Sequence, residues 1–484
     1  MEFLSAPETW IGRVFFERGL AALYLIAFIA ARNQFPALLG ERGLLPAPEF
    51  LRSRSFAQGP SLFHWRYSDR FFSVVAWTGI AMSAAILVGA LAAAPVGVPM
   101  IAWLVLSFLY LSIVNVGQRF YGFGWESMLV EAGFFAAVLS PQGMTPSLVP
   151  ILMVRWMLFR VEVGAGLIKI RAGGPWKDLT ALIYHHETQP MPNPLSRFSH
   201  RLPRPVLRGG VVFSHFVQIA VPFGLFFPQP VAGTAAALII LHQLLLIVFG
   251  NYAWLNWLTV VLAFAALPNS WLTFTGVQVP PDLAPRPMIW EMVQLGVLAA
   301  VIWLSIKPIR NLCSRRQLMN YSFNRWRLVN AYGAFGSITK VRHEIVIEGT
   351  ADSDAGAESE WREYEFKGKP GDPKRLPPQV APYHLRLDWL MWFLPLSVRV
   401  TSGGIFVPGY EPWFQRLIQK LLEGDRATIA LLKHNPFPGD PPRYLRARFY
   451  RYWFAPFGTG KVWERELVDE YLPPVDLPGL STRA

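Results

Sequence analysis

Long apolar runs are the feature that most constrains how this chain can fold. Of its 484 residues, 52% are hydrophobic and 14% aromatic, and the uncharged apolar runs gather in the first two thirds. A helix needs about 20 mostly apolar residues to cross the hydrocarbon core of a membrane, and several runs reach that length. A soluble protein of this length is usually more polar. We therefore expect a polytopic membrane protein whose polar last third forms a separate domain.

The apolar runs divide into seven to nine candidate membrane spans. They lie near residues 14–31, 71–94, 98–117, 124–140, 147–169, 211–228, 231–249, 252–268 and 288–306. The run at 124–140 is short and contains Glu126 and Glu131, which leaves the number of spans open. The predicted fold is an α-helical polytopic membrane bundle over residues 1–313, followed by a small α+β extramembrane domain over residues 314–484. The first run shows no cleavage signal and is expected to remain as an anchor.

The net charge of +13 is concentrated in loops beside the apolar runs. The loops 32–70 and 171–210 are rich in arginine, and nine spans would place both on the same side as the C-terminal domain. Basic loops next to membrane spans are typical of the cytoplasmic face, so the charge does not require a nucleic acid partner. We expect the lipid bilayer, and no nucleic acid, among the partners.

Cys313 is the one cysteine of the chain. The sequence therefore holds no internal disulfide, no CxxC redox pair and no zinc site built from cysteines. A protein-folding factor with this sequence could not act by internal thiol exchange.

One candidate span ends in the unusually charged segment "RWMLFRVEVGAGLIKIR", residues 155–171. Arg155, Glu162 and Lys169 are spaced by seven residues, nearly two helical turns, so they share one face of a helix. A charge at the bilayer centre costs about 2.5–3.5 kcal/mol, which predicts that this face points into the bundle. Glu162 is the expected counter-ion of the two cations. Arg160 lies off the face and needs another acid, for which Glu126, Glu131 and Glu17 are available. The predicted structural ion network comprises Arg155, Arg160, Glu162, Glu126 and Glu131.

Lys169 allows two interpretations. It follows "GAGLI", whose small residues let neighbouring helices approach closely, and a desolvated lysine can act as a base. It also lies near the end of the candidate span, where it could extend to the membrane surface or form an ion pair. Lys169 is therefore a candidate base whose function stays open.

The loop that follows is rich in polar residues and prolines. Its candidate functional residues are Trp176, Lys177, Asp178, His185, His186, Glu187, Thr188 and Gln189. Adjacent histidines on a helix point about 100° apart and do not easily share one metal ion, and no HExxH spacing is present. We expect no metal and no cofactor here, but a rigid loop that docks a partner or covers a cavity.

In the last third of the chain, polar and apolar residues alternate as they do in a soluble α+β domain. Residues 339–350 and 361–369 read as strands, joined by the acidic stretch "ADSDAGAESE", which lacks the ligand pattern of an EF-hand. Residues 411–424 form a predicted amphipathic helix, and 443–454 a predicted strand with one wet face.

Several long segments resemble the lipase maturation factor family. They are "LLGERGLLPAPEFL", "GQRFYGFGWESMLVEAGF", "GLIKIRAGGPWKDLT" with "YHHETQPMPNPLS", "WRLVNAYGAFGSITKVRHEIVIEGT", "WREYEFKGKPGDP" and "YHLRLDWLMWF". The resemblance implies a multi-span membrane protein that helps secreted dimeric lipases, such as lipoprotein lipase, to fold and assemble. It implies no catalytic residue. Animal members reside in the endoplasmic reticulum, while the composition and single cysteine of this chain indicate a bacterial relative in the inner membrane.

The resemblance also bears on orientation and on the client. It implies that the C-terminal domain binds the client, a lipase or another exported hydrolase, on the lumenal or periplasmic side, whereas the basic loops indicate the cytoplasmic side. We expect the lumenal or periplasmic orientation. Asp388, Trp389 and Trp392 in "RLDWLMWF" are the client-binding candidates. The alternative for this segment is an amphipathic element that packs the domain against the membrane.

A remoter similarity links the membrane half to the transmembrane domain of vitamin K-dependent γ-carboxylases. In the corresponding stretch of those enzymes, the lysine proposed as the catalytic base stands at the position of Lys169. This similarity implies the alternative of a membrane enzyme that uses Lys169 on a lipid- or quinone-like substrate, and a purely structural scaffold is a third possibility. A maturation factor without enzymatic activity is the preferred hypothesis.

Overall fold

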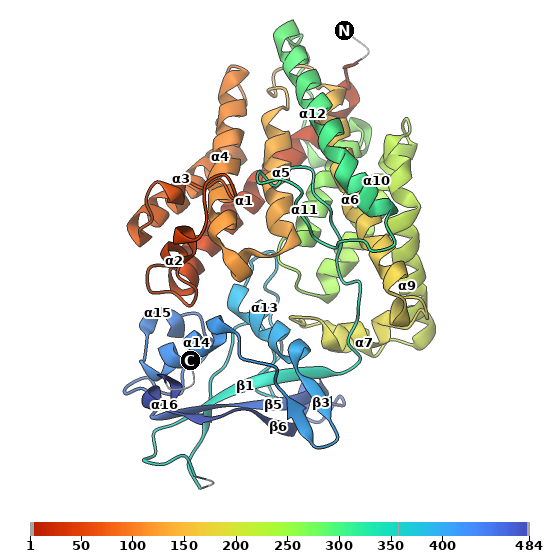
Figure 1. Cartoon of the computed structure of the whole chain (residues 1–484). Helices are drawn as coiled ribbons and strands as arrows, with labels where there is room; N and C mark the ends of the chain where they lie inside the picture. Colours follow the sequence, from red (N-terminus) through yellow and green to blue (C-terminus); the bar gives the residue numbers. More distant parts are fainter. Residues whose placement is uncertain (1–3, 357, 482–484) are drawn as a thin grey trace.

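The computed structural model describes residues 4–356 and 358–481. A bundle of helices forms the upper part of the molecule, and a mixed domain with antiparallel strands lies against one end of it (Figure 1). A linker, residues 314–341, runs from the bundle to this domain. The expected division into a helical part and an α+β part is thus seen directly.

The described part of the bundle contains long helices joined mostly by short loops. In chain order they are α1 (Trp10–Leu39), α3 (Asp69–Leu87), α4 (Gly97–Val116), α5 (Gly124–Ala137), α6 (Leu148–Ala172), α9 (Arg204–Ile219), α10 (Val231–Phe249), α11 (Leu255–Ala263) and α12 (Met288–Cys313). Ser68 and Ser147 precede α3 and α6, and each side chain accepts a hydrogen bond from a backbone N–H of the first turn. Such N-caps satisfy amide groups that a helix start leaves without a partner.

Six helical segments of the described chain are long and apolar enough to cross a membrane. They are Pro7–Leu39, Asp69–Leu87, Gly97–Val116, Arg204–Phe226, Val231–Phe249 and Met288–Cys313. Of the remaining candidates, α6 has 25 residues but carries several charges, and α5 and α11 have 14 and 9 residues. The membrane character is confirmed, whereas the predicted number of seven to nine spans is not.

Small residues in α6 bring its neighbours close, as the sequence predicts. A Cβ atom on Gly164 would lie 2.1 Å from the carbonyl oxygen of Tyr332 in the linker. A Cβ atom on Gly166 would lie 2.6 Å from the side chain of Ile219 at the end of α9. Contacts this short would force the backbone apart, so the glycines hold the linker and α9 against α6.

The C-terminal domain is built on a four-stranded antiparallel sheet. Its strand order is β2 (Arg362–Glu363), β1 (Arg342–Thr350), β5 (Tyr444–Phe454) and β6 (Trp463–Val475). β3 (Arg399–Thr401) and β4 (Gly404–Phe406) form a separate hairpin beside β6. The helices are α13 (Arg386–Phe393), α14 (Pro412–Leu422), α15 (Arg426–Ile429) and α16 (Leu477–Ser481).

The sequence patterns of this domain are mostly confirmed. The strands predicted at 339–350 and 443–454 correspond to β1 and β5, and the acidic stretch connects the antiparallel pair β1 and β2. The predicted strand at 361–369 is reduced to Arg362–Glu363. The apolar face of α14 is buried, as its periodicity predicts, through Trp413, Leu417, Ile418 and Leu421.

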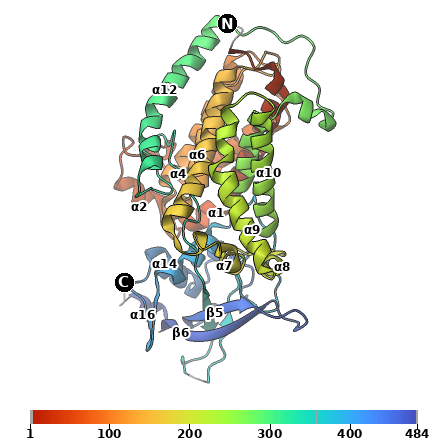
Figure 2. The ribbon, with the colours of Figure 1, turned by 90° about the vertical axis from the view of Figure 1, so that its right-hand side faces the viewer.

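The predicted basic loop 171–210 lies between the bundle and the sheet. Its helices α7 (Ala181–Thr188) and α8 (Ser196–His200) lie directly above β5 and β6 (Figure 2). The loop 32–70, which contains α2 (Ala47–Arg52), lies at the same end of the bundle (Figure 1). The predicted placement of both loops on the side of the C-terminal domain agrees with the structure.

Candidate functional site

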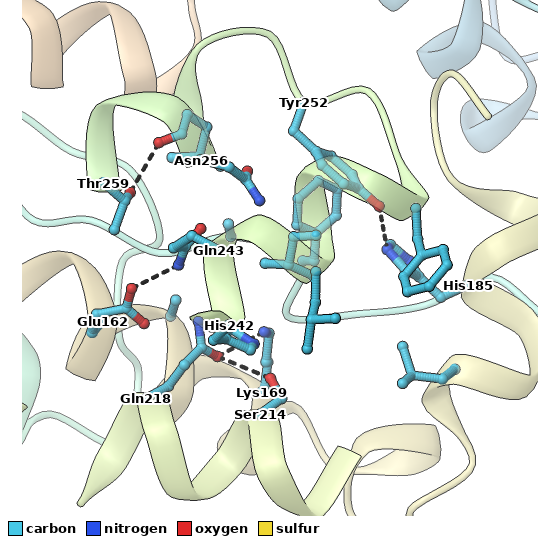
Figure 3. Close-up of a pocket in the computed structure, with 18 of the residues that line it drawn as sticks. Glu162, Lys169, His185, Ser214, Gln218, His242, Gln243, Tyr252, Asn256 and Thr259 are labelled. Atoms are coloured by element: carbon cyan, nitrogen blue, oxygen red, sulfur yellow. Dashed lines mark hydrogen bonds between the residues drawn. The ribbon is translucent and has the colours of Figure 1, made fainter. Parts of the chain in front are cut away.

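A cavity of about 400 Å³ opens among α6, α9, α10 and α11, close to the end of the bundle that meets the C-terminal domain. Figure 3 shows its polar wall. The polar side chains that line it include Glu162, Lys169, Gln218, His242, Gln243 and Asn256, and the rest of the lining is largely apolar. The charged face predicted for α6 therefore points inward.

Lys169 is buried in this cavity wall and does not extend to the membrane surface. Its ammonium donates a hydrogen bond of 2.7 Å to Oε1 of Gln218 on α9. The same ammonium lies 4.6 Å from the ring centroid of Trp176. Lys169 is thus held by an amide and an aromatic face, which contradicts the one alternative in which it extends to the membrane surface.

Glu162 and Arg155 do not form the predicted ion pair. Oε1 of Glu162 accepts a hydrogen bond of 2.7 Å from Gln243 of α10. Arg155 instead donates to the backbone carbonyls of Leu225 and Ala265, at 3.2 and 3.3 Å. Residues seven apart share a helix face but are separated by about 10.5 Å along the axis, so a shared face does not imply contact.

The two acids of α5 each pair with an arginine from elsewhere. Glu131 forms a buried ion pair with Arg160 and also accepts hydrogen bonds from Asn330 and Tyr332 of the linker. Arg160 and Glu131, two members of the predicted network, therefore lie together, and side chains of the linker also bind this carboxylate.

Glu126 pairs with the C-terminal domain instead of with α6. Its Oε1 lies 2.6 Å from a guanidinium nitrogen of Arg386 in α13, and its other oxygen accepts a hydrogen bond from Tyr110. His384 also lies 3.3 Å from this carboxylate. Burial lowers the pKa of His384 to about 4, so the ring that contacts Glu126 is neutral. The predicted network is thus split into separate pairs, one of which joins the two domains.

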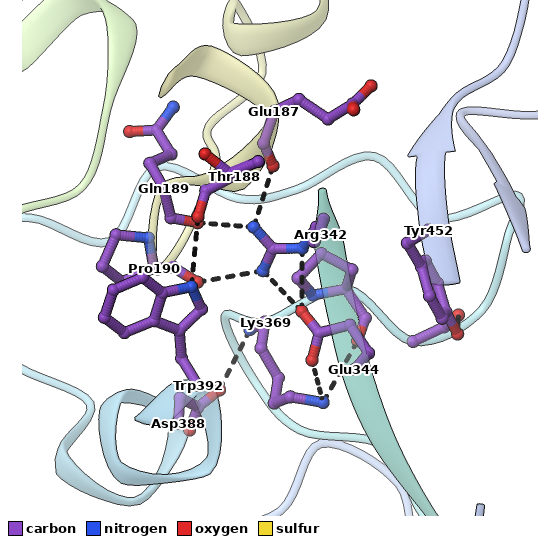
Figure 4. Close-up of polar contacts among 12 residues, drawn as sticks. Glu187, Thr188, Gln189, Pro190, Arg342, Glu344, Lys369, Asp388, Trp392 and Tyr452 are labelled. Atoms are coloured by element: carbon purple, nitrogen blue, oxygen red, sulfur yellow. Dashed lines mark hydrogen bonds and ion pairs between the residues drawn. The ribbon is translucent and has the colours of Figure 1, made fainter. Parts of the chain in front are cut away.

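Arg342 makes a second connection between the domains (Figure 4). From β1, its guanidinium donates to the backbone carbonyls of Glu187, Gln189 and Pro190, at 2.9, 2.5 and 3.1 Å. One carboxylate oxygen of Glu344 lies 2.5 Å from the same guanidinium, and the other lies 2.8 Å from the ammonium of Lys369. Since a planar guanidinium offers five donors in a fixed geometry, one side chain holds three carbonyls, one in the last turn of α7 and two in the loop that follows.

The predicted functional loop contacts both the cavity wall and the C-terminal domain. His185 is hydrogen-bonded to Tyr252 at 2.7 Å, and Tyr252 donates to Gln189 at 2.6 Å. The carboxylate of Glu187 accepts a hydrogen bond of 2.9 Å from the backbone N–H of Phe454 in β5. His186 packs against the ring of Phe249. These contacts link the cavity wall to the sheet.

The remaining predicted residues of this loop divide into two groups. Trp176, Thr188 and Gln189 are buried, while Lys177 and Asp178 are exposed. Burial lowers the pKa of His185 to about 3 and that of His186 to about 4, so both rings are neutral. Within the described residues, no group of three or more histidine, cysteine, aspartate and glutamate side chains is placed to hold a metal ion.

The predicted client-binding residues lie inside the junction between the bundle and the C-terminal domain. Asp388 accepts hydrogen bonds from the backbone N–H groups of Gly368 and Lys369, at 2.5 and 3.2 Å, and its burial raises its pKa. Trp389 stacks edge-on against Trp125 of α5, with centroids 4.9 Å apart. The indole N–H of Trp392 donates to the carbonyl of Thr188 at 3.1 Å. α13 faces the bundle, so these side chains lie in the contact between the two domains, and their binding of a client stays a prediction.

Sequence reasoning missed the basic residues that hold the junction, Arg342, Lys369 and Arg386. Each is at most 2% exposed. For Arg386 and Arg342 a signal was present in "YHLRLDWL" and "VRHEIVIEG", where charged residues stand between apolar ones. Such charges are almost never buried without a partner, so each one implies an opposite charge elsewhere in the chain.

Comparisons with known proteins agree with the division into a helical membrane part and a C-terminal domain. Residues 11–274 match the family profile described as lipase maturation factor transmembrane domain, and residues 328–473 match the profile described as lipase maturation factor C-terminal domain. No solved structure matches the chain.

Similar proteins cover nearly the full length. The chain is 39% identical to Lipase maturation factor 1 of Bos taurus, over 99% of this chain and 92% of that protein. It is 38% identical to Lipase maturation factor 1 of Homo sapiens, with coverage of 99% and 90%. Lipase maturation factor 2 of Homo sapiens is 29% identical, with coverage of 97% and 84%.

These matches describe no enzyme, so they give no support to the alternative of a membrane enzyme that acts through Lys169. The full-length relatives cover both parts of the molecule and the linker that joins them. With a matching profile for each domain and near-complete alignment to named relatives, the chain belongs to the lipase maturation factor family.

Proposed function

We propose that this protein is a membrane-embedded factor that helps secreted lipases, or other exported hydrolases, to reach their active form. The observation that carries the proposal is the near-complete alignment with proteins named lipase maturation factor. The buried junction supports it, because it holds a folded domain in a fixed position at the membrane surface. A client that emerges at that surface would meet this domain first.

The membrane part of the proposal is a bundle of nine passages. α5, α6 and α11 alternate in direction with the six long apolar helices and complete the series (Figure 1). Apart from Arg171 in the last turn of α6, their charged side chains are buried in the bundle, so these helices can lie at membrane depth with little charge exposed to lipid. An odd number of passages puts the described start of α1 and the C-terminal domain on opposite sides.

The proposed orientation places the C-terminal domain in the lumen of the endoplasmic reticulum or, in a bacterium, in the periplasm. The argument is that exported clients fold on that side. Ser353 is exposed in the connection between β1 and β2, and Cys313 is the one cysteine. In spheroplasts of a bacterial host, a Ser353→Cys, Cys313→Ala chain should react with an impermeant thiol reagent added to the medium. Labelling only after lysis would reject this orientation.

The proposed client surface is the apolar patch around the β3–β4 hairpin. Val400, Phe406 and Leu467 are exposed to 53%, 55% and 47%, although each is apolar. The hairpin is tied to β6 by a 2.8 Å hydrogen bond from the N–H of Ile405 to Asp469. Since β6 ends the sheet, an incompletely folded client could add a strand beside this patch.

The function is tested in cells that lack the gene for this chain. The activity of a secreted lipase in the medium should fall, while pulse labelling shows unchanged synthesis. Re-expression of the full chain should restore the activity. Normal lipase activity in the deletion strain, for every lipase that the cell exports, would contradict the proposed function.

A further inference from the structure

The cavity beside Lys169 has no assigned occupant, and several of its polar groups lack a partner. Oε2 of Glu162, both ring nitrogens of His242 and Nδ2 of Asn256 make no hydrogen bond with any described residue. These three side chains are at most 3% exposed. Buried polar groups are nearly always hydrogen-bonded, so a set of unpartnered ones around a common space indicates that something polar occupies that space.

The remaining wall of the cavity suits an apolar chain. Leu207 and Phe213 of α9 line it from one side, and Leu246 and Phe249 of α10 line it from the other. Water alone would satisfy the polar groups but would leave this apolar wall wet. A molecule with one polar end and one apolar chain satisfies both parts at once.

The cavity reaches the outer surface of the bundle between α9 and α10. Val206 and Leu245 line the cavity and are also exposed, to 54% and 41%. Both belong to segments that are apolar and long enough to cross a membrane. The mouth of the cavity therefore faces lipid chains, and the route to it leads from within the membrane.

The polar end of the occupant follows from the groups that it meets. Glu162 and Lys169 carry opposite formal charges on the same helix, so the site has no net charge that would favour an ionic head. The free oxygen of Glu162 requires a donor, whereas the amide nitrogen of Asn256 and the ammonium of Lys169 require acceptors. Hydroxyl and ester carbonyl groups together provide both.

We propose that this cavity binds a neutral single-chain amphiphile with hydroxyl and carbonyl groups, of the monoacylglycerol type, taken laterally from the membrane. The hydroxyl groups donate to Glu162, and the carbonyl accepts from Asn256 or Lys169. The chain lies between α9 and α10. The volume of about 400 Å³ lies in the lower part of the usual range for small-molecule sites, about 300–1,000 Å³, which suits one chain better than two. The proposal is independent of the proposed client function.

The test uses the purified full chain in phosphatidylcholine nanodiscs with a monoacylglycerol that carries a diazirine on its chain and an alkyne at the chain end. After irradiation, labelled peptides should map to α9 and α10, and excess unlabelled monoacylglycerol should suppress the labelling. A fatty acid and an alkane with the same diazirine serve as comparison probes. Equal labelling by the alkane, preferential labelling by the fatty acid, or no specific labelling by the monoacylglycerol would overturn the proposal.

Two variants and one matched control sharpen the result. Leu207→Trp fills the cavity from α9, and Glu162→Gln removes the charged acceptor while keeping the shape. Both should lower labelling. For Glu162→Gln, which loses one charge-assisted hydrogen bond, we expect a reduction of roughly tenfold. Val212→Trp places the same ring on the exposed face of α9 and should label as the wild type does. If Leu207→Trp fails to fold, Glu162→Gln carries the test, and its undiminished labelling would contradict the site.

Discussion

Arg386 of α13 lies 2.6 Å from Glu126 of α5, and both side chains are fully buried where the C-terminal domain meets the bundle. Arg386 also donates to the carbonyl of Phe120, at 2.8 Å, and its guanidinium lies 3.4 Å from the ring centroid of Tyr121. The two charges come from residues 260 apart in the sequence. Each is therefore without an opposite charge as soon as the domains separate.

Removal of one member of this pair should destabilise the protein strongly. Arg386→Met leaves Glu126 buried without its counter-ion, and we expect a loss of about 3–5 kcal/mol of unfolding free energy. The double variant Glu126→Gln, Arg386→Met should recover a large part of this loss, because no uncompensated charge remains. Thermal and denaturant unfolding in detergent micelles measure both effects.

The matched control is an exposed ion pair at the same domain boundary. Arg119 and Glu411 lie 3.0 Å apart, and the side chain of Arg119 is 64% exposed. Exposed pairs contribute about 0–1 kcal/mol, so Arg119→Met should have little effect. If Arg386→Met and Arg119→Met unfold alike, the buried pair does not hold the junction.

Arg342 should fix the loop after α7 through the shape of its guanidinium as well as through its charge. Arg342→Lys keeps the charge but cannot reach three carbonyls and Glu344 together. We expect the linker 314–341 and the loop 189–195 to be cleaved several times faster in limited proteolysis of the folded protein. Arg362→Lys, at an exposed ion pair with Glu360 on β2, is the control and should be cleaved at the wild-type rate. Equal cleavage of the two variants would show that the charge alone suffices.

The membrane bundle and the C-terminal elements could be predicted from sequence because their signals are local. Apolar runs and the spacing of Trp413, Leu417, Ile418 and Leu421 need no knowledge of distant segments. The junction could not be predicted in this way. An aromatic helix such as Arg386–Phe393 reads equally well as an exposed binding surface or as a buried face, and only its partner, Glu126, distinguishes the two.

The charged face of α6 shows the same limit within one helix. Heptad spacing places Arg155, Glu162 and Lys169 on one side, which the cavity confirms for the latter two. The spacing does not select partners, and amides and carbonyls of neighbouring helices take the place of the expected ions. Neutral hydrogen-bonding groups that satisfy charges leave no signal in a charge pattern.

The buried histidines of α7 should make the protein less stable in mild acid. In the folded state burial lowers the pKa of His185 to about 3 and that of His186 to about 4, whereas an unfolded histidine has a pKa of about 6.5. Their stabilising contribution is complete above pH 6.5. It declines as the pH falls towards 4, because only the unfolded state takes up protons. Each histidine adds up to about 1.4 kcal/mol per pH unit to this slope.

Thermal unfolding between pH 7.5 and 5 measures the effect. The double variant His185→Gln, His186→Gln should show a lower midpoint at pH 7.5, since a 2.7 Å hydrogen bond to Tyr252 is altered, but a flatter dependence on pH. His434→Gln, at an exposed histidine, should keep the wild-type slope. A double variant with an unchanged slope would show that these two rings do not govern the acid response.

The hairpin patch and the junction should separate client activity from stability. Phe406 is 55% exposed and Val400 is 53% exposed, so Phe406→Ser and Val400→Ser should leave the unfolding midpoint of the protein unchanged. If the patch holds a client, both variants should lower the specific activity of a secreted lipase co-expressed with them.

Trp392→Phe loses the 3.1 Å hydrogen bond to Thr188 and should lower the midpoint without altering the activity of the lipase per molecule of folded factor. The comparison requires the amount of each variant in the membrane and the amount of secreted lipase, both by immunoblot. The reverse pattern, in which Trp392→Phe abolishes lipase activity at wild-type stability while the hairpin variants are silent, would return the client surface to α13.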